Sequence, residues 1–133
     1  MKTAAILFLL VTTLAKAQLA VNVSTVKVTG SKAIVSLAMQ NNFTEKIESA
    51  RAVVFLLDEQ GKMAGQATRW IIGGSEDKPG LAAGTTNTFH FVITSNKPFT
   101  TTNLTAKLSF SRLVLEGGKL VDAAKGVVVG KKP

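Results

Sequence analysis

Residues 47–72 read IESARAVVFLLDEQGKMAGQATRWII, and this stretch decides the fold class. Its first part, Ile47 to Leu57, becomes apolar on both alternating faces over its second half. A strand with two apolar faces usually lies inside a sheet that is covered on both sides. We therefore expect 47–57 to be a central strand whose two apolar faces are both covered within the fold, or whose second face is left for a partner protein. The polar run 58–62 contains Gly61, which tolerates positive φ, and it predicts a hairpin turn into a second strand, Met63 to Ile72.

Alternating patterns on both sides of this hairpin predict further strands. They cover residues 19–28, 33–40, 85–94, 104–115 and 120–129. In the strand 85–94, Phe89, Phe91 and Ile93 are expected to face inward, opposite His90. In the strand 104–115 the inward parity changes, which predicts a β-bulge near Ser111-Arg112. Seven short strands with no helix are typical of an immunoglobulin-like antiparallel β-sandwich.

The first seventeen residues are predicted to be a signal peptide that is cleaved after Ala17. Met1-Lys2 is a basic start, the run from Ala4 to Ala15 is almost wholly apolar, and small residues stand three and one positions before Gln18. This is the layout of a secretory leader, and its apolar run is too short to span a bilayer. We therefore expect one secreted or periplasmic domain, residues 18–133, without a transmembrane span.

Composition narrows the possible functions. The chain has no cysteine, which excludes disulfides, thiol nucleophiles and thiolate metal sites. A cysteine-free exported domain fits a bacterial envelope. The net charge is +8, and it becomes +6 when the two leader lysines are removed. These basic residues are scattered as on a solvated surface, so nucleic acid is not an expected partner.

Several short motifs lie at fixed places in the expected strands and turns. They are a Gly30-led strand ending in Asn42, Val54-Phe55-Leu56-Leu57-Asp58, the turn glycine Gly61, and Leu81-Ala82-Ala83-Gly84 before Phe89-His90-Phe91. Through them the chain resembles the FxLyD-type immunoglobulin-like modules of bacterial exported proteins, over Val28 to about Ile93. Leu56 and Asp58 match the L and D of the family motif, whereas Val54 replaces its Phe and Leu57 its Tyr. The resemblance implies an envelope sandwich module and no particular activity.

No catalytic or cofactor motif is present, and we expect a protein that is not an enzyme and holds no cofactor. His90 is the only histidine, and no Asp or Glu lies beside it on its strand to orient the ring. Glu76-Asp77 in the long loop 73–80 lacks the regular oxygen-ligand spacing of calcium loops and is followed by Lys78. We therefore expect no metal site.

The candidate ligand-binding residues are Arg69, Trp70, Glu76 and Asp77. An exposed indole can stack on a sugar ring, but the only tryptophan of the chain is more readily explained as a core or interface residue. We expect a non-enzymatic module that binds another envelope protein by a sheet face or by an exposed edge strand, for adhesion or assembly. The alternative is a small-ligand or polysaccharide-binding domain that uses Trp70 and the loop 73–80.

Overall fold

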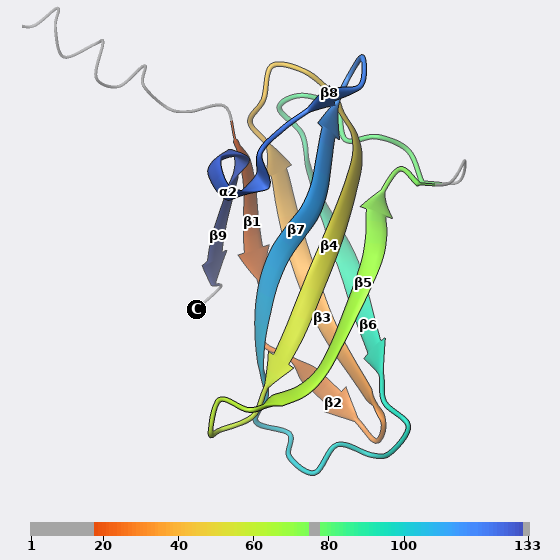
Figure 1. Ribbon diagram of the computed structural model, residues 1–133, viewed down its shortest axis with the longest axis vertical. Helices are drawn as coiled ribbons and strands as arrows, with labels where there is room; N and C mark the ends of the chain where they lie inside the picture. The colour runs from red at the N-terminus through yellow and green to blue at the C-terminus, as the bar shows by residue number, and fades with distance from the viewer. Residues whose placement is uncertain (1–17, 75–77, 132–133) are drawn as a thin grey trace, which may run out of the picture.

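The computed structural model describes residues 18–74 and 78–131, and these form two β-sheets packed face to face (Figure 1). The first sheet contains β1 (Leu19–Val23), β2 (Lys27–Thr29), β3 (Lys32–Asn41), β6 (Thr86–Thr94) and β9 (Val127–Lys131). The second sheet contains β4 (Ile47–Leu57), β5 (Met63–Ile72), β7 (Thr105–Leu115) and β8 (Lys119–Leu120). The expected all-β sandwich is confirmed, whereas the predicted leader lies outside the described residues.

The core lies between the sheets, where the inward parities of the strands meet. The fully buried side chains include Val35, Leu37 and Met39 of β3, and Ala50, Ala52, Val54 and Leu56 of β4. On β6, Phe91 and Ile93 are buried and Phe89 is half-buried, as predicted. Full burial of a large aliphatic or aromatic side chain contributes about 1.5–3 kcal/mol. The period-two pattern therefore fixes which face of each strand turns inward.

Strand β4 is central in its sheet, paired with β5 on one side and β7 on the other. Its inner face is fully buried, but Val53, Phe55 and Leu57 on its outer face are only half-buried. The first of the two expectations, that both faces are covered within the fold, is therefore wrong. In a two-layer sandwich each sheet packs against one other sheet, so the second apolar face of β4 is left toward solvent.

Two local predictions are confirmed. In the β4–β5 turn, Asp58 Oδ1 accepts hydrogen bonds from the main-chain N–H groups of Gln60 and Lys62, both at 2.9 Å, and Gly61 has a φ of 79°. The bulge in β7 is at Ser111, which is skipped between the pairs Arg51–Arg112 and Ala52–Phe110. Both features are set by residues within a few positions, which is why the sequence reveals them.

The expected first strand, 19–28, is two strands. β1 and β2 both pair with β3, but the chain between them leaves the ladder at Ser24. There the Ser24 hydroxyl accepts a hydrogen bond from the Ser36 N–H at 2.9 Å, and the Ser24 N–H donates to the Ser36 carbonyl at 2.9 Å. A side-chain oxygen thus replaces one ladder acceptor, and the strand is divided.

The expected closing strand, 120–129, is also divided, and the absence of a helix was a wrong prediction. β8 ends at Leu120, and a short helix α2 (Ala123–Gly126) leads into β9. Asp122 caps this helix, because its Oδ1 accepts a hydrogen bond from the Ala124 N–H at 3.0 Å. The helix carries the chain from the second sheet to the first, where β9 pairs parallel with β1. The described residues thus contain nine strands instead of seven.

Candidate functional site

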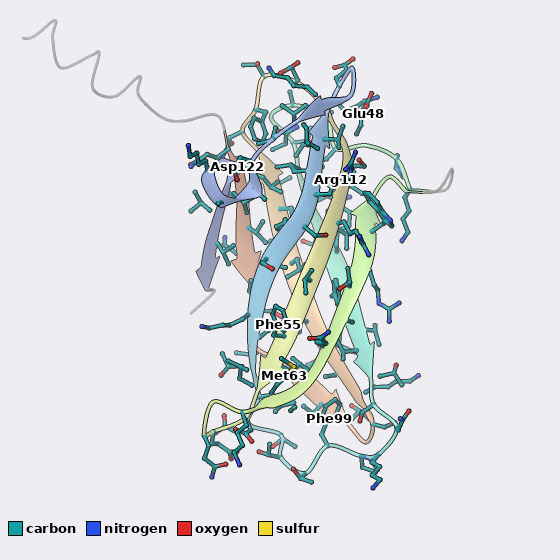
Figure 2. The ribbon with its side chains drawn as sticks, in the orientation of Figure 1. Glu48, Phe55, Met63, Phe99, Arg112 and Asp122 are labelled. Carbon is teal, nitrogen blue, oxygen red and sulfur yellow. The ribbon has the colours of Figure 1, made fainter. Side chains whose placement is uncertain are left out.

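The outer face of the second sheet carries a stripe of apolar side chains. This outer stripe consists of Val53, Phe55, Leu57 and Met63. Leu57 is the direct cross-strand neighbour of Met63, and Met63 is 57% exposed. In Figure 2 this sheet is in front, with Phe55 and Met63 labelled along it. The stripe continues along β4 on the face that the first sheet does not cover.

A row of three large side chains crosses the same face just beyond the stripe. This arginine row consists of Arg112 of β7, Arg51 of β4 and Trp70 of β5. Arg51 is the register partner of both Arg112 and Trp70. Neighbouring strands lie about 4.8 Å apart, so the row spans roughly 10 Å. Both arginines are exposed, and Arg51 stands two residues before Val53 of the stripe.

Trp70 is half-buried within this row. The Arg51 guanidinium carbon lies 6.0 Å from the centre of the indole ring, within the range of a cation–π contact. The main chain of Gly74 also lies against the ring, because a Cβ at position 74 would be 2.6 Å from Trp70 Cγ. These contacts cover part of the indole, so Trp70 holds Arg51 in place more than it offers an open stacking surface.

The arginine row is positively charged, and within the described residues no acidic side chain forms an ion pair with it. Among residues 18–74 and 78–131, the ion pair found is Lys119 with Glu45, at 3.3 Å. In the same part of the chain, neither Arg51 nor Arg112 has a carboxylate within ion-pair distance. The outer face therefore combines an apolar stripe with two arginines that lack an acidic partner there.

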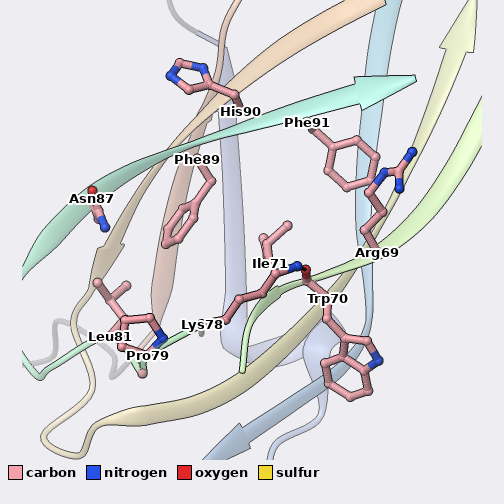
Figure 3. Close-up of a pocket in the computed structure, with 11 residues that line it drawn as sticks. Arg69, Trp70, Ile71, Lys78, Pro79, Leu81, Asn87, Phe89, His90 and Phe91 are labelled. Carbon is pink, nitrogen blue, oxygen red and sulfur yellow. Dashed lines mark hydrogen bonds between the residues drawn. The ribbon is translucent and has the colours of Figure 1, made fainter. Parts of the chain in front are cut away.

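An edge groove of about 330 Å³ lies between β5 and β6, which belong to different sheets (Figure 3). Its apolar lining includes Ile71, Leu81, Phe89 and Phe91. Arg69 Nη2 donates to the Val92 carbonyl of β6 at 3.1 Å, and Lys78 Nζ donates to the Trp70 carbonyl of β5 at 2.7 Å. Charged side chains that cover the edge of a strand hinder its pairing with another chain. At these carbonyls, the edges of β5 and β6 are thus protected.

The structure separates the residues that the sequence suggested as one site. Arg69 lies on the inner parity of β5, opposite Ala52, and reaches across to β6, whereas Trp70 lies on the outer parity, opposite Arg51. Figure 3 shows the Arg69 guanidinium and the Trp70 indole pointing away from each other. Glu76 and Asp77 lie outside the described residues. Alternation along a strand explains the separation, because adjacent side chains point to opposite faces.

His90 lies on the outer face of the first sheet, as predicted. Its Nδ1 is 2.9 Å from the hydroxyl oxygen of Ser36, its direct neighbour on β3. Sequence reasoning missed this contact, which only the β3–β6 register could have shown. The spacing suits a nucleophile and a base. Within the described ranges, however, no Asp or Glu is hydrogen-bonded to His90, so the usual third, orienting group is lacking there.

Two other functional features, a metal site and a membrane-spanning helix, are absent from the described residues. Residues 18–74 and 78–131 contain no group of three or more His, Cys, Asp or Glu side chains placed to hold a metal ion. No helix in the same ranges has the length and apolarity needed to cross a membrane.

Comparison with known proteins identifies the fold and no family. No protein-family model matches the chain, and no curated protein matches it in sequence. Among solved structures, the chain is similar to the "Putative ApaA Protein from Bordetella pertussis", with a TM-score of 0.56 and 16% identity. The match covers 78% of this chain and 85% of that one. At this identity the likeness supports the sandwich architecture alone, and the FxLyD resemblance stays a prediction.

Proposed function

We propose that this protein is an exported, non-enzymatic module that binds another envelope protein through the outer face of its second sheet. One observation carries the proposal. The second half of β4, from Val53 to Leu57, is apolar on both faces, but the sandwich fully buries only one of them. Apolar side chains that the fold itself does not fully bury are typical of a surface that binds a partner.

The composition of this face supports protein binding. Aromatic residues, Met and Arg are enriched at the centres of protein interfaces, and Trp and Arg often dominate the binding energy. The face brings together Phe55, Met63, Trp70, Arg51 and Arg112. The protected carbonyls of Val92 and Trp70 argue against strand addition at that part of β5 and β6. Recognition by the sheet face is therefore the form of binding that we favour.

Phe55→Glu is expected to release the partner. A charge in the middle of the outer stripe cannot be buried against an apolar partner, and loss of a dominant interface residue costs about 2 kcal/mol or more, roughly thirtyfold in affinity. The measurement is the native size of the protein in a gently solubilised envelope extract. Wild type should migrate well above the monomer, and the variant should migrate as the monomer.

The matched control for this experiment is Thr88→Glu. Thr88 is an exposed strand residue on the outer face of the first sheet, so the same charge is placed on the opposite side of the molecule. This variant should keep the wild-type size. Monomeric migration of wild type, or an unchanged complex in Phe55→Glu, would reject the proposal.

A small-ligand site is the second candidate, and the edge groove is the observation in its favour. Its volume of about 330 Å³ and its apolar lining fall at the lower end of what ligand pockets show. NMR titration with glycan fragments separates the two proposals, because Phe89 and Phe91 line the groove, whereas Val53 and Phe55 belong to the outer stripe. Shifts of the Phe89 and Phe91 signals that leave the stripe unchanged would favour the second candidate.

Export is the part of the proposal that depends on the leader. We expect the protein recovered from the envelope or the medium to begin at Gln18. Intact-mass analysis of the protein purified from its own cells checks this, since removal of residues 1–17 lowers the mass by a fixed amount. A cytoplasmic protein that keeps all 133 residues would contradict it.

A further inference from the structure

We infer that the arginine row is a recognition site for a carboxylate on an extended, acidic and apolar segment of the partner protein. This inference rests on the proposed function and adds the chemistry of the partner. Arg51 and Arg112 are register partners beside Trp70, and this row lies at the end of the outer stripe.

Arg51 of β4 and Arg112 of β7 are direct register partners. Like charges placed directly opposite each other on neighbouring strands repel and weaken the sheet. Within residues 18–74 and 78–131, no carboxylate forms an ion pair with either side chain. An anion that bridges both guanidinium groups would remove the repulsion.

The fold places Arg51 and Arg112 on the same face of the sheet. The bulge at Ser111 shifts the parity of β7, so Arg112 lies on the outer face opposite Arg51. Without the bulge, Arg112 would follow Phe110 on the inward parity. Trp70 restrains Arg51 through the 6.0 Å cation–π contact. Guanidinium groups bind carboxylates through two parallel hydrogen bonds. Less side-chain entropy is lost on binding when the guanidinium is already held in place.

The geometry favours a peptide over an acidic polysaccharide. Arg51, Val53, Phe55 and Leu57 follow one another on the same face of β4, at steps of about 7 Å. An extended peptide repeats its side chains on one face at the same interval, so one carboxylate followed by alternate apolar residues matches the row and the stripe together. A sugar chain would need an open aromatic platform, and the Trp70 indole is partly covered by Arg51 and Gly74.

The test compares two synthetic peptides, acetyl-ESLSL-amide and acetyl-QSLSL-amide, by NMR titration of the full mature chain. The side-chain signals of Arg51, Arg112 and Trp70 report the row. The acidic peptide is expected to bind at least tenfold more tightly than its glutamine counterpart. Arg51→Gln and Arg112→Gln should each abolish this preference.

Arg69→Gln is the matched control, because Arg69 is also exposed on this sheet but turns to β6. This variant should keep the tenfold preference. The inference is overturned if wild type shows no preference, if the preference survives in Arg51→Gln or Arg112→Gln, or if digalacturonate shifts the same signals more than the acidic peptide does.

The failure of this inference can be told apart from the failure of the proposed function. Loss of the large complex in Phe55→Glu, together with no preference for the acidic peptide, removes only the carboxylate site. No large complex in wild type removes the proposed function itself.

Discussion

Replacement of Asn41 by alanine is expected to lower the free energy of unfolding by about 3–5 kcal/mol, the largest effect of a single polar residue in this fold. Asn41 is completely buried at the end of β3. Its Nδ2 donates to the carbonyls of Glu45 and Leu81, both at 2.9 Å, and its Oδ1 accepts from the Phe43 N–H at 2.8 Å. Alanine leaves these three main-chain groups without their partner, and each unsatisfied buried group costs about 1–3 kcal/mol.

Denaturant unfolding followed by far-UV circular dichroism measures this effect, and Asn42→Ala is its control. Asn42 is adjacent in sequence but exposed, so its replacement should change stability by about 0.5 kcal/mol or less. A destabilisation by Asn41→Ala no greater than that of Asn42→Ala would show that the network contributes little. If the alanine variant does not fold, Asn41→Ser, whose hydroxyl can still donate one hydrogen bond and accept another, should be intermediate in yield.

Gly73→Ala is expected to destabilise the protein by about 2–5 kcal/mol, for two independent reasons. Gly73 has a φ of 68°, which an alanine adopts only with strain. A Cβ at this position would also overlap the main-chain oxygen of Glu48 and lie 2.8 Å from Ser49 Cβ. Gly73 thus allows the end of β5 to approach the start of β4.

Gly84→Ala separates these two causes, with thermal unfolding as the measurement. Gly84 has a φ of 76°, but nothing lies within 4 Å of the Cβ that alanine would add. Its replacement should therefore show only the backbone strain, roughly 1–2 kcal/mol. Equal losses in the two variants would mean that the close approach at Gly73 does not matter.

Gly73 also bears on the candidate site, because Gly74 follows it and packs on Trp70. A displaced 73–74 segment would free the indole and, with it, Arg51. Partial unfolding of this corner should therefore weaken binding at the arginine row before the whole sandwich unfolds.

Local features of the fold could be predicted because their causes lie close together in the chain. The β4–β5 hairpin depends on Asp58 and Gly61, and the bulge at Ser111 shows as a change of parity within one strand. The broken first strand could not be predicted in this way, since Ser24 leaves the ladder through its contacts with Ser36. The helix after Asp122 was missed because its four residues, 123–126, are too few to show a helical period.

The candidate site was predicted only in part. The sequence singles out Trp70 as the only tryptophan, but it suggests the chain neighbours of Trp70, Arg69 and the loop 73–80, as the partners. The structure pairs Trp70 with Arg51, and Arg51 with Arg112. Arg51 and Arg112 are 61 positions apart and become neighbours only through the register of β4 and β7. A single sequence does not reveal that register.

The sequence by itself determined the all-β class, the inward face of most strands and the main turns, because period-two burial and turn chemistry act over a few residues. Tertiary structure decided that the second apolar face of β4 is only half-buried and that two arginines are register partners next to it. The physical reason is that layer number and strand register result from packing between distant segments. The binding face that we propose for this protein is a product of that packing.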